Sequence, residues 1–361
     1  MSYTARVLTV PPPTRPPHRK LALAALLAAC ACQPAPAPSS PQDADAPQPP
    51  APGDAAPAGQ PPAPPGQPPA PPPRDTAAPP AQAAAGSAAR ATLEARTPVK
   101  LAPPPFGEAL FRPAPGGGAA APRLVKLSEK KNTITDEAEW FTRNGVALPL
   151  LQVPDSPWSG PGPLPASVPT WYRPTWSRGL IQLVKAIDHG DHLALFYGPS
   201  PIDGRFLAIL DEARRVVAFF DFESFLAPTE SEPNDAAFVR GELRWAEVKD
   251  GVLYVATGHR TYAASSKGKN AYLSALDLAS GQLLWQSAPL VCNAGNFVLR
   301  GDHLLCGYGF TAEPDFLYVL ERTTGKITSK IPLKSGPDVL IEKDGKLFVR
   351  TYDTDYVFEI R

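Results

Sequence analysis

The chain has 361 residues, and its 35 lysines and arginines are balanced by 35 aspartates and glutamates, so the formal net charge is zero. No run of basic residues exceeds a pair, which excludes the basic surface typical of a nucleic-acid-binding protein. Most of the 48 prolines lie in the first third of the chain, which sets that part apart from the remainder.

Residues 1–30 have the features of a lipoprotein signal peptide. A basic region precedes the apolar stretch 21–29, which is too short to cross a bilayer. The stretch ends in LAAC, residues 27–30, which resembles the lipobox of bacterial lipoproteins. The resemblance implies acylation at Cys30 and a lipid anchor. The residue after Cys30 is Ala31 and not Asp. By resemblance to the enteric sorting rule, this favours the outer membrane over the inner membrane. An ordinary secretory signal cut nearby is the alternative.

Residues 31–122 are dominated by Pro, Ala, Gln and Gly, as in QPPAPPGQPPAPPPR. Almost no large apolar residue precedes Leu93, so we expect a disordered tether that buries no core. At about 3.1 Å per residue in extended polyproline II, the tether reaches on the order of 200 Å from the membrane. A binding site for a partner that recognises PxxP motifs is the alternative for this region.

Residues 123–361 suit a single large β domain, because four similar stretches recur in them. These stretches read AIDHGDHLALFYG, EVKDGVLYVATG, FVLRGDHLLCGYG and IEKDGKLFVRTY. Each has a strand-like run, a turn with Gly, and alternating apolar positions, a pattern typical of a β-hairpin. The turn glycines are separated by 61, 50 and 44 residues, close to the spacing of propeller blades. They are Gly190, Gly251, Gly301 and Gly345.

A second motif follows the hairpins. Residues 275–285, ALDLASGQLLW, resemble the A-x-D-x-x-x-G-x-x-x-W pattern of the quinoprotein-like (PQQ-like) β-propeller repeat. The resemblance implies that Gly281 turns between the third and fourth strands of a blade and that Trp285 docks between neighbouring blades. Two weaker copies each keep part of the pattern. They are 209–219, with Phe219 at the Trp position, and 319–329, with Gly325 at the turn and Ser329 at the Trp position.

We therefore predict an all-β fold, a small β-propeller with about four to five blades of four antiparallel strands. The last repeat supplies three strands, so a strand from 123–127 is expected to complete the final blade. A fifth blade from 130–184 is allowed, and a β-sandwich is the alternative fold.

Loops between the second and third strands of each blade should share one rim with the connections between blades, and this rim is the candidate binding face. A rim of locally paired surface charges is the alternative. The candidate binding residues are His259, Arg260, Tyr262, Lys267, Glu313, Asp315, Arg350 and Asp353.

Catalytic motifs are missing from the sequence, which has no G-x-S-x-G elbow, P-loop or HExxH. His189 and His192 lack further ligands for a metal site, so no metal is expected. The adjacent Cys-Cys pair of quinoprotein dehydrogenases is absent, and we expect no cofactor. The aromatic residues 158–176 could stack on sugars, but packing is the favoured interpretation.

The cysteines of the domain, Cys292 and Cys306, could form a disulfide in an exported protein. A straight hairpin at Gly301 would hold them too far apart, whereas a fold-back at residues 293–295 would bring them together. Both outcomes stay open from the sequence.

The repeat resemblance covers about 185–361, half of the chain. In its layout of anchor, tether and propeller, the chain is similar to BamB-type envelope lipoproteins, which are longer and lack so long a tether. The resemblance favours a lipid-anchored outer-membrane protein whose propeller is a non-catalytic scaffold for an unknown envelope protein. Either face of the outer membrane is possible. A cell-envelope sugar-binding protein or hydrolase that uses the loop rim is the alternative function.

Overall fold

The computed structural model describes residues that all fall in one compact unit, 73–361. The described residues are 93, 95–106, 109–112, 120–151, 173–176, 179–199, 203–226, 231, 235 and 239–361, without the side chains of 173–180. The predicted signal peptide with Cys30 and most of the predicted tether lie outside the described residues.

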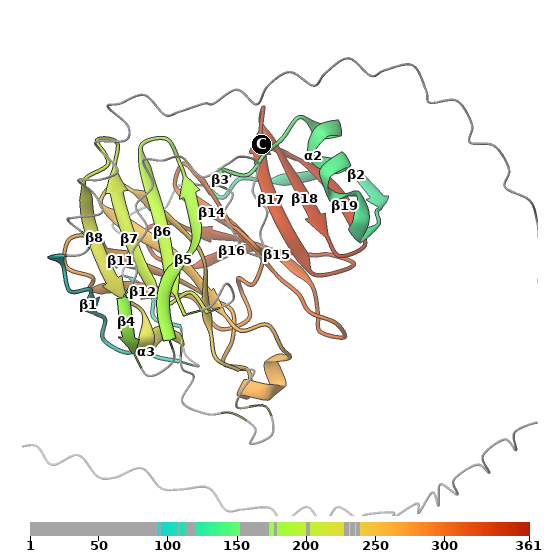
Figure 1. Ribbon diagram of the computed structural model, residues 1–361. Helices are drawn as coiled ribbons and strands as arrows, with labels where there is room; N and C mark the ends of the chain where they lie inside the picture. Colours follow the sequence, from blue (N-terminus) through green and yellow to red (C-terminus); the bar gives the residue numbers. More distant parts are fainter. Residues whose placement is uncertain are drawn as a thin grey trace, which may run out of the picture. The chain divides into compact units, whose positions relative to one another are not determined.

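Four sheets follow one another along the chain (Figure 1). The first three each contain four antiparallel strands in chain order, whereas the last takes its fourth strand from the start of the domain. The first contains β5 (Gly179–Asp188), β6 (His192–Gly198), β7 (Phe206–Asp211) and β8 (Val216–Asp221). The second contains β9 (Glu242–Lys249), β10 (Val252–Gly258), β11 (Tyr272–Asp277) and β12 (Leu283–Gln286). The third contains β13 (Val298–Arg300), β14 (His303–Tyr308), β15 (Phe316–Glu321) and β16 (Ile327–Pro332). The fourth contains β17 (Pro337–Lys343), β18 (Lys346–Thr351), β19 (Thr354–Ile360) and β2 (Leu124–Lys131).

Consecutive sheets pack against one another through shared apolar cores. One buried cluster joins side chains of the first three sheets, and another joins the third sheet to the fourth. Four successive four-stranded sheets with cores between neighbours are the blades of a β-propeller, so the predicted fold class is confirmed. A β-sandwich would place its strands in two facing sheets, which is not the arrangement of these strands.

The hairpins turn at the predicted glycines. Asp250 and Gly251 have φ of 52° and 72°, and Asp344 and Gly345 have φ of 51° and 71°. Two successive positive φ values define a type I′ turn, which matches the twist of the flanking strands. The sequence Asp-Gly therefore fixes the register of β9 with β10 and of β17 with β18.

The strand predicted to complete the last blade is present. β2 pairs antiparallel with β19, with Lys126 opposite Phe358 and Ser128 opposite Val357. Arg123 N–H also donates to Arg361 O at 2.9 Å. The observed strand extends to Lys131, four residues beyond the prediction, and it joins the start of the domain to its end.

The described part of 130–184 does not form the fifth blade that the sequence allowed, so that prediction is wrong there. This part forms η1 (Ile134–Asp136), α2 (Glu137–Asn144), and two strands, β3 (Leu150–Leu151) and β4 (Arg173–Trp176), which pair with β5. α2 contributes Trp140 to a small core with Val339 and Ile341 of the fourth blade. The segment thus covers a blade instead of forming one.

The domain starts earlier than the predicted boundary at residue 123. β1 (Val99–Lys100) pairs in parallel with β8, and Leu110 forms a β-bridge with Gln286. Leu93 and Leu101 are buried in the propeller cores. The apolar residues of this segment are separated by prolines and were too sparse to predict a strand. The edge strand β8 nevertheless pairs with β1. Residues 93–112, as far as they are described, belong to the domain and not to the tether.

Trp285 docks between blades as the repeat predicts. Its ring is buried against Gly325 of the next blade, and its Nε1 donates to Arg322 O at 3.0 Å. In the first blade the prediction that Phe219 takes this position is wrong. The strand register places Ala218 there, because the turn after Asp211 is one residue shorter, and Phe220 packs on Gly281 instead.

The remaining short helices are α3 (Glu223–Leu226), which follows the first blade, and η2 (Ala263–Ser266), in the loop between β10 and β11. In the part of the chain that the structure describes, no helix combines the length and the apolar character needed to cross a membrane.

Candidate functional site: a charged pocket on the loop rim

A pocket of about 630 Å³ opens on the rim predicted as the binding face. The loops after β10, β14 and β18 line it, together with the connections between blades and residues of η1 and α2. This volume lies in the usual range of ligand pockets. The second, third and fourth blades therefore meet at one concave site.

Four of the eight predicted rim residues line this pocket. They are His259, Arg260, Asp315 and Arg350. The other four lie outside the lining: Tyr262, Lys267, Glu313 and Asp353.

Those four have roles that the structure makes visible. Glu313 joins two loops, since it accepts a hydrogen bond from Ala263 N–H at 2.7 Å and another from the Tyr308 hydroxyl. Asp353 accepts from Ser335 Oγ, and Tyr262 packs edge to face on Phe310. Lys267 ends η2 in a left-handed conformation, with φ of 50°.

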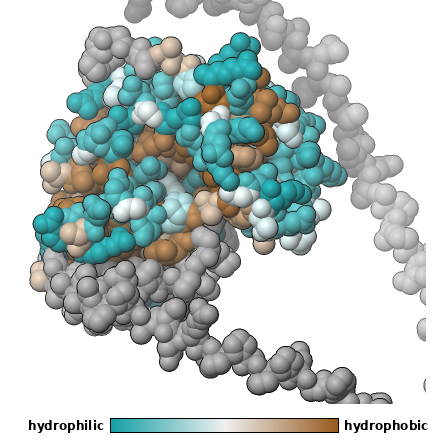
Figure 2. Space-filling model, turned by 90° about the horizontal axis from the view of Figure 1, so that it is seen from above, coloured by the Kyte–Doolittle hydropathy of each residue, from teal (hydrophilic) through white to brown (hydrophobic). Residues whose placement is uncertain are grey.

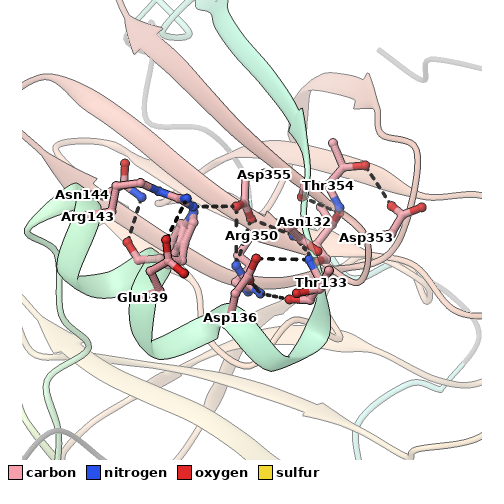
Figure 3. Close-up of polar contacts among 12 residues, drawn as sticks. Asn132, Thr133, Asp136, Glu139, Arg143, Asn144, Arg350, Asp353, Thr354 and Asp355 are labelled. Atoms are coloured by element: carbon pink, nitrogen blue, oxygen red, sulfur yellow. Dashed lines mark hydrogen bonds and ion pairs between the residues drawn. The ribbon is translucent and has the colours of Figure 1, made fainter.

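Arg350 lines the pocket, and its guanidinium lies among several polar groups (Figure 3). Its Nη2 donates to Thr133 O at 2.6 Å and to Asp136 Oδ1, and its Nη1 donates to Asp355 Oδ1 at 3.3 Å. Asn132 adds a hydrogen bond from Nδ2 to Asp355 Oδ1 at 2.7 Å. The Arg350 guanidinium lowers the pKa of Asp136. Arg350 therefore holds the segment before α2 against the last blade, and its charge is already paired.

Arg260 and Arg244 share one carboxylate, that of Glu242. Arg260 donates from Nε and Nη2 to its two oxygens at 2.5 and 3.1 Å. Arg244 Nη1 reaches Oε1 at 3.3 Å. Burial lowers the pKa of Arg244. The fork geometry of Arg260 with Glu242 is the stronger of the two pairs.

Three carboxylates of the lining have no ion pair and no side-chain hydrogen bond in the described part of the protein. They are Glu137, Asp315 and Asp338. Asp315 Oδ1 is buried and has no hydrogen-bond partner among the residues that the structure describes. Desolvation raises the pKa of Asp315 to about 6, with help from Asp353 and Glu313. Burial raises the pKa of Asp338. Burial and the negative charge of Asp338 together raise the pKa of Glu137.

Gly309 and Gly336 explain how the loops close around Asp315. A Cβ on Gly309 would overlap both the Asp315 carboxylate and the Gly336 backbone. Only glycine lets the loop after β14 approach the connection between the third and fourth blades so closely.

His259 is held as a structural group in the pocket wall. Its Nε2 lies 2.7 Å from Ser266 Oγ, and its Nδ1 lies 3.4 Å from Thr261 N. Burial lowers the pKa of His259 to about 4, so the ring is neutral at pH 7. A neutral ring with both nitrogens engaged is a poor proton carrier at that pH.

Apolar side chains are exposed at the pocket mouth. Ile134 and Tyr352 line the pocket and are 69% and 70% exposed. Tyr262, packed on the lining residue Phe310, is 45% exposed. The space-filling view shows hydrophobic residues at the surface in patches between hydrophilic ones (Figure 2). Exposed aromatic residues beside a pocket are typical of recognition surfaces.

Sequence reasoning missed Arg244, Asp338 and Glu137. The first two lie at the starts of β9 and β17, where a charged residue in a strand pattern gives no sign of facing a pocket. Glu137 comes from the segment predicted as a fifth blade. Only the packing of α2 on the fourth blade brings it to the rim.

The two histidines of the first hairpin turn are structural. Their rings stack with centroids 4.5 Å apart, and His189 Nε2 lies 2.9 Å from Ala246 O in the next blade. His192 Nδ1 lies 2.6 Å from Asp191 Oδ1. The described residues hold no group of three or more side chains suited to a metal ion.

Cys292 and Cys306 form a disulfide, with their Cα atoms 5.5 Å apart. The chain folds back between them, where Asn293 N–H donates to Gly307 O at 2.9 Å and Gly295 N–H to Asp338 O at 2.7 Å. Of the two outcomes left open by the sequence, the structure adopts the fold-back. Cys292 directly precedes the pocket residue Asn293 in the chain.

The aromatic residues between 158 and 176, considered as a platform for sugars, fall almost entirely outside the described residues. Trp158, Trp171 and Tyr172 lie outside the described residues, and only the backbone of Trp176 is described.

Comparison with known proteins gives no family. No family model matches the chain, and no curated protein matches it. Among solved structures, BamB from Moraxella catarrhalis is similar over 66% of this chain and 100% of its own, with 10% identity and a TM-score of 0.26. The computationally designed Ika4 protein is similar over 47% of this chain and 86% of its own, with 12% identity and a TM-score of 0.30. A europium-containing methanol dehydrogenase is similar over 48% of this chain and 28% of its own, with 15% identity and a TM-score of 0.28.

TM-scores and identities this low give no evidence for the family or the function of this protein. The β-propeller assignment rests on the strand order, the pairing and the shared cores described above.

Proposed function

We propose that this protein is a lipid-anchored envelope protein whose β-propeller is a non-catalytic scaffold for protein–protein interaction. The observation that carries the proposal is the rim around the pocket, where Ile134, Tyr262 and Tyr352 expose apolar surface beside buried charges. Tyr and Arg at a concave site are the residue types that dominate binding energy at protein interfaces. His259, held neutral and structural, supports a binding role over proton transfer at this rim.

The membrane location is supported by the sequence LAAC at 27–30. Acyl chains on Cys30 would bind a bilayer with about 0.8 kcal/mol per buried CH₂ group. The outer membrane is proposed because Ala31 follows the cysteine. Mass spectrometry of the mature N-terminus tests the anchor, since a Cys30→Ala variant should lose the acyl mass and leave the membrane fraction.

The interaction role is tested by crosslinking intact cells and recovering the protein. An Ile134→Ala/Tyr352→Ala variant should lose a specific crosslinked envelope protein. Val217→Ala is the matched control, because Val217 is exposed on β8, away from the pocket lining. Equal recovery of the same protein by all three forms would contradict the proposal.

Asp315 favours one second candidate, a sugar-binding protein or hydrolase that uses the rim. A carboxyl group with pKa about 6 in a pocket is suited to general acid catalysis. Hydrolysis of a panel of chromogenic glycosides tests this candidate. Activity that falls by orders of magnitude in Asp315→Asn would support the enzyme, whereas a scaffold shows no turnover in either form.

A further inference from the structure

The basic and the acidic residues of the rim pocket differ in whether they already form ion pairs within the protein. The four basic residues that line it each have a carboxylate partner. Arg350 pairs with Asp136 and Asp355, Arg260 and Arg244 pair with Glu242, and Lys334 pairs with Glu129. Among the described residues, the acidic residues of the lining, Glu137, Asp315 and Asp338, have no ion-pair partner, although the charges of Arg244, Arg350 and Arg260 act on Asp338 from farther away. The charge left for a ligand is therefore negative.

The three free carboxylates come from three different parts of the fold. Glu137 begins α2, Asp315 precedes β15, and Asp338 lies at the start of β17. They do not converge closely enough to form a candidate metal site among the described residues. Carboxylates distributed around a cavity of about 630 Å³ suit an extended organic cation better than a compact metal ion.

The mouth of the pocket adds an apolar component. Tyr352 and Ile134 are both about 70% exposed and both line the pocket. Arginine and lysine side chains combine an apolar stem with a cationic head, and an aromatic ring binds either part. A ligand with a charged tip and an apolar stem therefore matches both the mouth and the interior.

We propose that this pocket receives lysine or arginine side chains from a basic segment of a partner protein, with their cationic heads held by Asp315, Asp338 and Glu137 and their stems against Tyr352 and Ile134. This inference rests on the proposed function, because it names the chemistry of the partner that the scaffold binds. The Arg244 guanidinium is already engaged, since it shares Glu242 with Arg260 and donates from Nε to Ala294 O at 3.4 Å.

The test uses the full-length protein in detergent micelles and a fluorescein-labelled decapeptide of alternating Arg and Gly, followed by fluorescence anisotropy. Asp315→Asn and Asp338→Asn should each weaken binding about tenfold, as expected for the loss of a charge-assisted contact. Glu137→Gln changes an exposed side chain and should weaken binding as well. Glu212→Gln, on the turn between β7 and β8, is the matched control and should leave binding unchanged.

Several results would overturn the inference. One is that all four variants bind the basic peptide as well as the wild type does, and another is that the wild type does not bind it. A third is that the protein prefers an alternating Glu-Gly decapeptide and that Arg244→Gln abolishes this preference. The proposed function fails separately. A rim-dependent crosslinked protein without peptide binding would reject the cation site and keep the scaffold. Variant-sensitive peptide binding without any crosslinked protein would support the site and reject the scaffold.

Discussion

The backbone N–H of Val248 donates a hydrogen bond to His192 Nε2 at 3.0 Å, across the boundary between the first and second blades. An imidazole nitrogen that accepts this bond carries no proton. The neighbouring His189 contacts Ala246 O in the same strand, β9. The first hairpin turn is thus fixed to the next blade by two neutral histidines.

The pH dependence of stability should reflect these histidines. Burial lowers the pKa of His192 and lowers that of His189 to about 4, from an ordinary value of 6.5. Because the folded pKa values are depressed, the stabilisation is fully present above pH 6.5 and is lost as the pH falls toward 4. For His189 the loss is of order 3 kcal/mol in the free energy of unfolding.

A His189→Gln/His192→Gln variant isolates this effect, because glutamine can donate to Ala246 O and accept from Val248 N–H but does not titrate. Urea unfolding at several pH values should give a flatter profile for the variant than for the wild type between pH 6.5 and 4. Parallel profiles would show that the histidines do not carry the acid sensitivity.

The repeat motif predicts the cost of adding one methyl group at two turn glycines. Gly325 and Gly345 have similar positive φ, 76° and 71°, so alanine costs about 1 to 2 kcal/mol of backbone strain at each. Only Gly325 lies against a buried ring, that of Trp285. Gly325→Ala should therefore lower the free energy of unfolding by about 1 to 3 kcal/mol more than Gly345→Ala, because overpacking adds to the strain. Equal losses in urea unfolding would contradict the docking of Trp285.

Arg350 should contribute far more to stability than Arg143, although both contact Asp355. The Arg350 side chain is 4% exposed, and its removal leaves Asp136 without its ion pair and Asp355 with only Asn132 and Arg143 as partners among the described residues. Arg350→Met should cost about 3 to 5 kcal/mol, the usual cost of breaking a buried pair. Arg143→Met removes a half-exposed contact and should cost less than about 1 kcal/mol. Comparable losses for the two variants would show that Arg350 does not clamp the segment before α2.

The disulfide should stabilise the domain measurably. Cys292 and Cys306 close a loop with a sequence separation of 14, for which chain entropy predicts about 3 kcal/mol. Reductant should lower the thermal midpoint of the wild type and leave that of Cys292→Ala/Cys306→Ala unchanged. A wild type insensitive to reductant after full thiol titration would argue against this contribution.

The sequence predicted features that depend on neighbouring residues along the chain. Asp250-Gly251 fixes its hairpin because the turn requires positive φ at both positions, and no distant residue alters that need. The sequence Gly-Asp-His occurs in two of the hairpins, but this repetition did not predict the contacts of its histidines. His192 Nε2 accepts a hydrogen bond from Val248 N–H, whereas His303 Nε2 is buried with no hydrogen-bond partner in the described part of the chain, so the same three residues make different contacts.

The pocket could be predicted only in part. His259, Arg260 and Asp315 were found because loops after the second strand of a blade share one rim. Arg244 and Asp338 were missed because their exposure depends on how neighbouring blades meet. The pairing state of each charge, which decides what the pocket can bind, depends on long-range contacts such as Arg350 with Asp136.

The most direct test of the account is site-specific photocrosslinking in living cells. A benzoylphenylalanine would replace one exposed residue at a time, at Ile134, Tyr262 and Tyr352 on the rim and at Val217 and Leu127 elsewhere. We predict that the three rim positions crosslink to the same envelope protein and that the other two do not. Crosslinks confined to Val217 or Leu127, or no crosslink at any rim position, would contradict the claim that this rim is the recognition face.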